Sequence, residues 1–401
     1  MAERLTAEVA VVGGGPAGLT AAIALAGAGI ETALIARGPP EDHRTTALLS
    51  SSVTALVTLS VWPGCAPHAA PLRMMRIVDD TGRLIRAPEV HFDAAEIGLD
   101  AFGHNIENRH LVAALDSRAR ELGALRRVAD EARGIGTENG QVVITLAGGG
   151  EITSRLVVGA DGRHSLCRAA AGIERDGDVY PQTALTFNLS HARPHEDTST
   201  EFHTASGPFT LVPLPGNRSS LVCVTAPAEA EHIAGLSDAA LADEIERRAH
   251  SILGKIQVEP GRGRFPLAVE TARSFARNRV ALIGEAAHLL PPIGAQGLNL
   301  GLRDAAAITE LVVAARRTGG DVGANDLLTR YDAQRRADVT SRTFAVDLLN
   351  RSLLTDFLPV QGTRGLGLYL MDRIGPLRRA VMREGVAPAA SQPRLMRGEA
   401  L

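Results

Sequence analysis

The chain is poor in the residues that usually mark disulfide, zinc or nucleic-acid binding. It has only three cysteines in 401 residues, Cys65, Cys167 and Cys223, far apart and without a C-x-x-C pair. Neither a disulfide framework nor a zinc site is therefore expected, and no metal is predicted. The formal net charge of -3 gives no general attraction to a nucleic acid, so no nucleic-acid partner is expected.

Long hydrophobic runs are also missing. The apolar segment Leu19–Ile30 is too short to span a bilayer and contains two glycines. The first residues lead directly into a strand-like run, which leaves no room for a secretory signal peptide. The sequence therefore predicts a protein of the reducing cytoplasm without a transmembrane helix.

What is present is a βαβ pattern at the start of the chain. Val9–Val12 and Glu31–Ala36 read as buried strands around a helix at Pro16–Ala28. A helix at Asn108–Glu121 and strands at Gln141–Leu146 and Ile152–Val158 follow. Longer strands with one helix around Ser237–Leu253 then occupy Tyr180–Phe265, before a strand at Arg279–Ile283 and helices at Leu300–Arg317, Asn325–Leu354 and beyond Gly365. This order predicts an α/β domain with an inserted antiparallel sheet.

The first turn carries a G-x-G-x-x-G motif. Gly13 permits the tight turn, Gly15 lets a pyrophosphate approach the backbone, and Gly18 lets helix and strand pack closely. The helix amino terminus then faces the phosphate charge. The motif favours dinucleotide binding over a glycine-rich turn without a ligand.

The acid that normally binds the adenosine ribose about 20 residues later is missing. The second strand ends in Ala36-Arg37 instead. A basic residue there can read the 2′-phosphate of NADP, so an NADP site at Arg37 is one alternative. A solvated charge at a strand end is the other.

Two further segments place an acid just after an apolar strand, GADGRHSLCR at 159–168 and GEAAHLLPPIGAQGLN at 284–299. Together with the glycine motif they resemble the FAD-dependent aromatic hydroxylases, the single-component flavoprotein monooxygenases. RTTALLSSSV at 44–53, ENRHLVAAL at 107–115 and PPIGAQGLNLGLRD at 291–304 resemble the ubiquinone-biosynthesis branch. The resemblance implies a Rossmann-like FAD-binding domain of the glutathione-reductase type, as in p-hydroxybenzoate hydroxylase, with an inserted antiparallel β-sheet substrate domain and C-terminal helices.

The resemblance also implies a discontinuous domain division. The predicted parts are FAD-binding segments at 1–75, 101–179 and 266–320, substrate-domain segments at 76–100 and 180–265, and a C-terminal helical region at 321–401.

The family roles can be placed on individual residues of this chain. Predicted cofactor-binding residues are Gly13, Gly15, Gly18, Arg37, Arg44, Arg109, Asp161, Glu285, Gly297, Leu298 and Asn299. Pro292, Gly294 and Gln296 are predicted in the loop beside the isoalloxazine ring, and no side-chain base is assigned. His288 is expected to pack or to form a hydrogen bond. Glu285 stands where the family usually has aspartate, which keeps the charge but adds one methylene.

The implied activity is hydroxylation of an aromatic ring, with NAD(P)H as electron donor, O₂ as co-substrate and oxygen transfer through a flavin C4a-hydroperoxide. The implied substrate is a polyprenyl phenol of ubiquinone biosynthesis. A hydroxylase or epoxidase of a small soluble phenol or alkene, and a non-catalytic FAD-binding accessory protein, are the alternatives. A single tryptophan, Trp62, cannot supply the W-x-W-x-I-P signature of flavin halogenases.

Pocket-wall residues are predicted at Phe209 and Leu211, with core packing as the alternative, and at Trp62. Near the end of the chain, Leu366, Leu370, Ile374, Leu377 and Val381 recur at helical spacing beside arginines. This pattern fits either peripheral contact with the inner membrane face or a helix packed on the body. A ubiquinone-biosynthesis complex is a further expected partner.

Overall fold

The computed structural model describes residues 4–38, 42–82, 88–292, 294–354, 373–386 and 392–401. Its centre is a six-stranded sheet in the order β20-β21-β13-β2-β3-β9. The strands are β20 (Ala276–Arg277), β21 (Val280–Leu282), β13 (Leu156–Gly159), β2 (Val9–Val12), β3 (Thr32–Ile35) and β9 (Leu125–Val128). All neighbours in this sheet are parallel except β20 and β21. Every residue of β2, β3, β13 and β21 is buried, which explains their continuous apolar runs.

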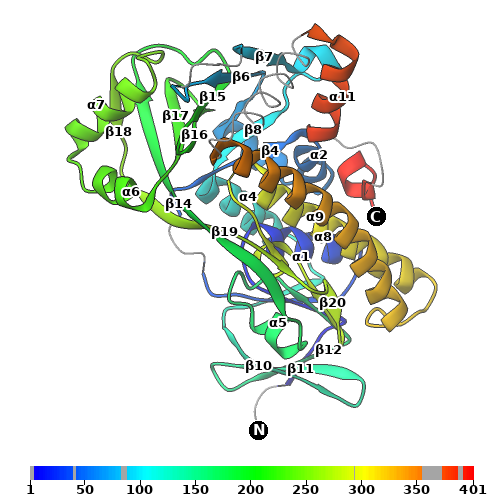
Figure 1. The fold of residues 1–401 in the computed structure, drawn as a ribbon. Coiled ribbons are helices and arrows are strands. Elements are labelled where there is room, and N and C mark those ends of the chain that lie inside the picture. Colours follow the sequence, from blue (N-terminus) through cyan, green and yellow to red (C-terminus); the bar gives the residue numbers. More distant parts are fainter. Residues whose placement is uncertain (1–3, 39–41, 83–87, 293, 355–372, 387–391) are drawn as a thin grey trace.

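Helices cover this parallel sheet. α1 (Pro16–Gly27) packs against both α4 (Asn108–Arg120) and α8 (Gln296–Arg317), and α9 (Asn325–Leu354) packs on α8. Figure 1 shows α9 running across the front of the molecule from α8 toward the antiparallel sheet. The short helix α5 (Leu166–Ala170) follows β13.

A second, nine-stranded sheet has the order β22-β19-β14-β17-β16-β15-β6-β7, with β18 paired to β14. Its strands are β6 (Met74–Asp79), β7 (Val90–Asp93), β14 (Arg175–His191), β15 (Thr198–Thr204), β16 (Gly207–Leu214), β17 (Arg218–Thr225), β18 (Ile256–Val258), β19 (Gly263–Ala272) and β22 (His288–Leu289). Helices α6 (Pro227–Ala234) and α7 (Asp238–Arg248) close the apolar core on one face of it.

Two small sheets complete the fold. One has the order β1-β12-β11-β10, with strands at Arg4–Thr6, Glu151–Ser154, Gln141–Leu146 and Ala132–Glu138. The other has the order β4-β8-β5, with strands at Thr45–Leu49, Gly103–Glu107 and Ala69–Pro71. The remaining α-helices described are α2 (Ser50–Thr58), α3 (Trp62–Cys65) and α11 (Gly375–Val386).

The structure confirms the predicted fold class and corrects several elements. The helix expected at Ser237–Leu253 ends at Arg248, because His250 and Ser251 adopt left-handed backbone, and α6 was not predicted. The strand expected at Ile152–Val158 is two strands in different sheets, since β12 ends at Ser154 and β13 starts at Leu156. Leu366 and Leu370 of the expected C-terminal helices lie outside the described residues.

Candidate functional site: the carboxyl edge of the parallel sheet

Three motif turns meet at one edge of the parallel sheet. Gly13 follows β2, Ala160 and Asp161 follow β13, and Gly284 and Glu285 follow β21. These strands are neighbours in the order β21-β13-β2 and run in the same direction, so their carboxyl ends lie side by side. In open α/β sheets this edge is where ligands bind.

The glycine turn has the geometry of a phosphate cradle. Gly13 has a φ of +117°, and a Cβ there would lie 2.2 Å from the Ala160 carbonyl oxygen. A Cβ on Gly18 would lie 2.1 Å from the Gly13 carbonyl oxygen, whereas a Cβ on Gly15 would meet nothing within 4 Å. Gly15 is the N-cap of α1 and no side chain caps that helix. The backbone donors of α1 therefore face an open position, which fits a pyrophosphate.

Asp161 and Arg168 hold the second turn to its neighbours. The Asp161 carboxylate accepts hydrogen bonds from Ser165 Oγ (2.6 Å) and the Cys167 amide (3.0 Å). Arg168 donates from Nη1 to the Ala286 carbonyl (2.9 Å) and from Nη2 to the Arg163 carbonyl (2.8 Å). Asp161 thus orders its own loop, and Arg168 joins that loop to the turn that carries Glu285.

Glu285 is exposed at the edge of the sheet. Hydrogen bonds to Asp42 and Glu270 raise the pKa of Arg44 and of Arg163, and the charge of Glu285 adds a smaller effect in the same direction to both. Arg44 donates to both oxygens of Asp42 at 2.8 Å, and Arg109 donates to Glu107 at 2.8 Å. The two arginines are half-exposed. The Asn108 amide donates to the Arg44 carbonyl (2.9 Å), which brings the segments of both arginines together.

The second strand of the βαβ unit ends beside the glycine turn. A Cβ on Gly14 would lie 2.6 Å from Ala36 Cβ, so a small residue at 36 faces this turn. Arg37 is largely exposed and forms an ion pair with Glu131. This pair agrees with a solvated charge at the strand end, which was one of the two alternatives for Arg37.

The predicted flavin-ring loop leads directly into α8. Gly294 and Ala295 have φ values of +64° and +55°, and Ala295 is the N-cap of α8 without a side-chain cap. Pro292, Gly294 and Gly297 are exposed, and Leu298 packs partly buried against the main core. Gln296 donates from Nε2 to the Gly294 carbonyl (2.9 Å). The helix begins at Gln296, four residues before the predicted start at Leu300.

Asn299 connects this loop to the three-stranded sheet. Its Oδ1 accepts from the Leu49 amide (2.9 Å), and its Nδ2 donates to the Ala47 carbonyl (2.8 Å) of β4. β4 pairs with β8, and Asn105 of β8 donates to the Pro213 carbonyl (2.9 Å) and to Ser220 Oγ (3.1 Å). The β4-β8 pair therefore joins the loop to β16 and β17 of the nine-stranded sheet.

The placement of Phe209 and Leu211 is a correction to their prediction as pocket-wall residues. Both are 2% exposed and belong to the core between the sheet and helices α6 and α7. Side chains alternate along a strand, so Thr210 and Val212 of β16 point to the opposite face, where they are partly exposed. Trp62 is partly buried and packs edge-on against His104, with ring centroids 5.0 Å apart.

Sequence reasoning missed Asp304, although it lies in the segment that carried the resemblance. The Asp304 carboxylate is fully buried and accepts from the Gly284 amide (3.0 Å), from His288 Nε2 (2.7 Å) and from Arg335 Nε (2.7 Å). Burial opposes its charge, but His288, Arg335 and the Gly284 amide outweigh it and hold the pKa of Asp304 below its usual value. The expected hydrogen-bonding role of His288 is confirmed. The signal in the sequence was Asp304 itself, an acid about one helical turn after Gly301 on the same helix.

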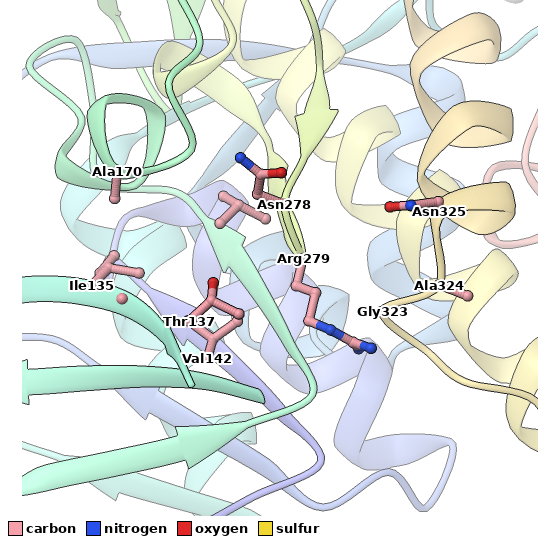
Figure 2. Close-up of a pocket in the computed structure, with 11 residues that line it drawn as sticks. Ile135, Thr137, Val142, Ala170, Asn278, Arg279, Gly323, Ala324 and Asn325 are labelled. Atoms are coloured by element: carbon pink, nitrogen blue, oxygen red, sulfur yellow. The ribbon is translucent and has the colours of Figure 1, made fainter. Parts of the chain in front are cut away.

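Other polar clusters of the described residues do not form a second centre. A cavity of about 480 Å³ lies at the opposite, amino-terminal edge of the parallel sheet, between Asn278, Arg279 and the start of α9 (Figure 2). Arg279 is paired there with Asp321 at 2.6 Å.

His191 and His195 have an H-x-x-x-H spacing, which the prediction that no metal binds did not take into account. His191 bonds to Ser219 and to the Arg193 carbonyl, and His195 bonds to the Leu214 carbonyl.

Comparison with known proteins identifies the class. Residues 6–344 match the family described as "FAD binding domain". The chain belongs to this family and is an FAD-dependent oxidoreductase of the aromatic monooxygenase class. It is 35% identical to the ubiquinone hydroxylase UbiL of Rhodospirillum rubrum, with 98% of this chain and 93% of that protein covered.

A second relative is the 3-demethoxyubiquinol 3-hydroxylase of Escherichia coli, at 30% identity over 94% of this chain and 97% of that protein. The p-nitrophenol 4-monooxygenase PnpA of Pseudomonas putida has a similar fold, with a TM-score of 0.78 at 20% identity, covering 96% of this chain and all of that one. The anhydrotetracycline hydroxylase OxyS of Streptomyces rimosus gives 0.74 at 22% identity, covering 97% of this chain and 77% of that one.

Proposed function

We propose that this chain hydroxylates the aromatic ring of a polyprenyl phenol in ubiquinone biosynthesis, with NAD(P)H and O₂ as co-substrates. The observation that carries the proposal is the meeting of three motif turns at one edge of the parallel sheet, next to two uncapped helix starts. The names of the relatives, which include a ubiquinone hydroxylase and a demethoxyubiquinol hydroxylase, support the substrate class.

In this proposal the FAD lies along the carboxyl edge. Its pyrophosphate meets Gly13, Gly15 and Gly18, and its middle part lies near Glu285, Arg44 and Arg109, with Asp161 ordering the adjoining loop. Its ring lies against the loop formed by Pro292, Gly294, Gln296, Gly297, Leu298 and Asn299. The bound cofactor supplies the electron transfer and the activation of O₂. The chain would bind the cofactor, orient the substrate and exclude water. The uncapped start of α8 would favour negative charge on the reduced ring.

The substrate ring is proposed to lie between this loop and the open face of the nine-stranded sheet. Thr210 and Val212 of β16 and Val222 of β17 share that face, because Thr210 pairs with Val222. All three are partly exposed and mostly apolar, which suits a phenol with a hydrocarbon tail.

The activity is tested by following NAD(P)H oxidation under air. A polyprenyl phenol should stimulate it and acquire one labelled oxygen atom from ¹⁸O₂, whereas small soluble phenols and alkenes should not. Stimulation by a soluble compound alone would instead support the first alternative. If the flavin-loaded protein shows no stimulated NAD(P)H oxidation with any polyprenyl phenol, soluble phenol or alkene, the result would support an accessory role.

The FAD site is tested with Gly15→Leu. The variant should fold, because Gly15 faces open space, but it should purify without the yellow flavin that the wild type releases on denaturation. A normal flavin content in this variant would contradict the assignment of the glycine turn.

We further propose that α11 contacts an anionic lipid surface on the inner face of the membrane. No helix of the described residues is long and apolar enough to cross a bilayer. On α11 and just before it, Ile374, Leu377 and Val381 are 42%, 42% and 46% exposed, next to the basic Arg379 and Arg383. Apolar side chains beside arginines suit an interfacial helix.

Vesicles of anionic and of neutral phospholipid should separate this proposal from a protein-binding surface. We expect co-sedimentation with anionic vesicles that is lost in a triple Ile374→Ser, Leu377→Ser, Val381→Ser variant. Val57→Ser, a 53% exposed apolar residue of α2, is the matched control and should not change it. Equal binding of wild type and triple variant would exclude lipid contact by α11 and leave the biosynthetic complex as its partner.

A further inference from the structure

A chain of buried charges links the turn of Glu285 to the flavin-ring loop. It starts at Asp304 of α8, which accepts from the Gly284 amide and from Arg335 of α9. Arg335 also donates from Nη1 to Asp338 (2.8 Å), so one guanidinium joins the two carboxylates. Arg335 is 1% exposed and lies at the interface of α8 and α9.

Asp338 gathers two further arginines. Arg303 of α8 donates to both of its oxygens, at 3.0 and 2.9 Å, and Arg342 donates from Nε at 2.9 Å. Burial opposes the charge of Asp338, but Arg303 and Arg335 overcome this effect and hold its pKa well below its usual range. Asp338 is therefore a carboxylate at neutral pH.

The network ends in the ring loop. Arg342 donates from Nη1 to Gln296 Oε1 (3.1 Å), and Gln296 Nε2 donates to the Gly294 carbonyl (2.9 Å). The Arg342 side chain is only 10% exposed. Three guanidinium groups stand here against two carboxylates, so the network carries an excess positive charge directly behind the loop. Such a charge in a poorly hydrated place acts more strongly than one in water.

We propose that Arg342 is a positioning residue for the flavin. Through Gln296 it fixes the loop before α8, and its charge favours the anionic reduced flavin over the oxidised one. The inference rests on the binding of FAD at this loop.

The test compares Arg342→Met with Arg342→Lys and with Arg336→Met. Arg336 is the matched control, because it lies on the same helix and its side chain is 46% exposed. Its hydrogen bonds among the described residues go to Asp332 and to the Arg273 carbonyl, away from the ring loop. The measured quantities are the midpoint potential of bound flavin, the dissociation constant of oxidised FAD, and the thermal unfolding of the apo-protein.

We expect Arg342→Met to weaken the binding of reduced FAD about tenfold more than the binding of oxidised FAD, which lowers the two-electron midpoint potential by about 30 mV. Arg342→Lys keeps the charge and should retain most of the wild-type potential. Arg336→Met should leave the potential unchanged. Gln296→Leu, which keeps the charge but breaks the bridge, should raise the dissociation constant of FAD without the shift in potential.

An unchanged potential in a flavin-loaded Arg342→Met, or the same shift in Arg336→Met, would overturn the inference. If Arg342→Met does not fold, a normal FAD affinity in Gln296→Leu together with a potential in Arg342→Lys that falls by the full amount of about 30 mV would overturn it as well. A wild-type protein that cannot be loaded with FAD would contradict the proposed function instead.

Discussion

The two helix starts at the carboxyl edge, those of α1 and α8, are built in opposite ways. The turn before α1 is bare backbone, with glycines at 13, 15 and 18 and no side chain over the helix end. The turn before α8 is held by side chains, Asn299 to β4 and Gln296 to the buried charges of α8 and α9. In the proposed FAD complex, the bare turn lets the diphosphate approach backbone donors closely. The supported turn gives the ring, which must react in one orientation, a fixed position.

The largest effect on stability should come from a change in the buried charges that support the start of α8. Asp304→Asn removes one carboxylate of the buried network and leaves Arg335 paired with Asp338 alone, so three guanidinium groups face one carboxylate, which costs about 3–5 kcal/mol of unfolding free energy. Urea unfolding of the apo-protein measures this loss. Asp238→Asn, at an 80% exposed carboxylate that pairs with Arg262, is the control and should change stability very little. A loss no larger than that of the control would show that the buried network does not stabilise the α8 start.

The same carboxylate predicts a dependence on pH. The folded pKa of Asp304 lies below its unfolded value of about 3.9. A group of this kind stabilises the fold fully above the unfolded pKa and loses that contribution as the pH falls through the folded pKa. The difference in stability between wild type and Asp304→Asn should therefore be constant above about pH 5 and narrow below about pH 4. A difference that widens in acid would contradict the assignment.

In the glycine turn before α1, two alanine substitutions separate an effect on packing from an effect on ligand binding. Gly18→Ala drives a Cβ into the Gly13 carbonyl, so we expect a loss of about 1–3 kcal/mol even without cofactor. Gly15→Ala adds its methyl to open space at a φ of -73°, and should change apo-protein stability by less than about 0.5 kcal/mol. Its effect should appear only as weaker FAD binding in a fluorescence titration. Equal destabilisation by both changes would remove this distinction.

The smallest effect is expected at Ala295. This residue holds a left-handed backbone that costs a non-glycine residue about 1–2 kcal/mol. Ala295→Gly relieves that strain but raises the entropy of the unfolded chain, which leaves a net gain of about 0.5 kcal/mol in thermal unfolding. Asn139→Gly is the control, since asparagine tolerates its φ of 49° in the β10-β11 turn. A destabilised Ala295→Gly would show that the loop is not strained.

The sequence was sufficient to predict the parts of the site that depend on local geometry. The turn at Gly13, the strand ends before Asp161 and Glu285, and the fold class follow from glycines, apolar runs and their order. The partners of Asp304 could not be predicted, because Gly284, His288 and Arg335 are brought to it by packing of α8 on the turn at Gly284–Ala286 and on α9. The orientation of Phe209 and Leu211 was also not predictable. A strand shows its alternation in sequence, but α6 was not predicted, and that helix lies on the face they occupy.

The pair of strands β4 and β8 has a consequence for substrate choice. Asn299 anchors the ring loop to β4, while Asn105 of β8 reaches the backbone of β16, so loop and sheet are aligned by two asparagine side chains that donate to backbone carbonyls. The side chains of Thr210 and Val212 on β16, which we propose face the substrate, take no part in this alignment. Under that proposal, changes at Thr210 or Val212 should alter the preference for one phenol over another without moving the sheet relative to the loop.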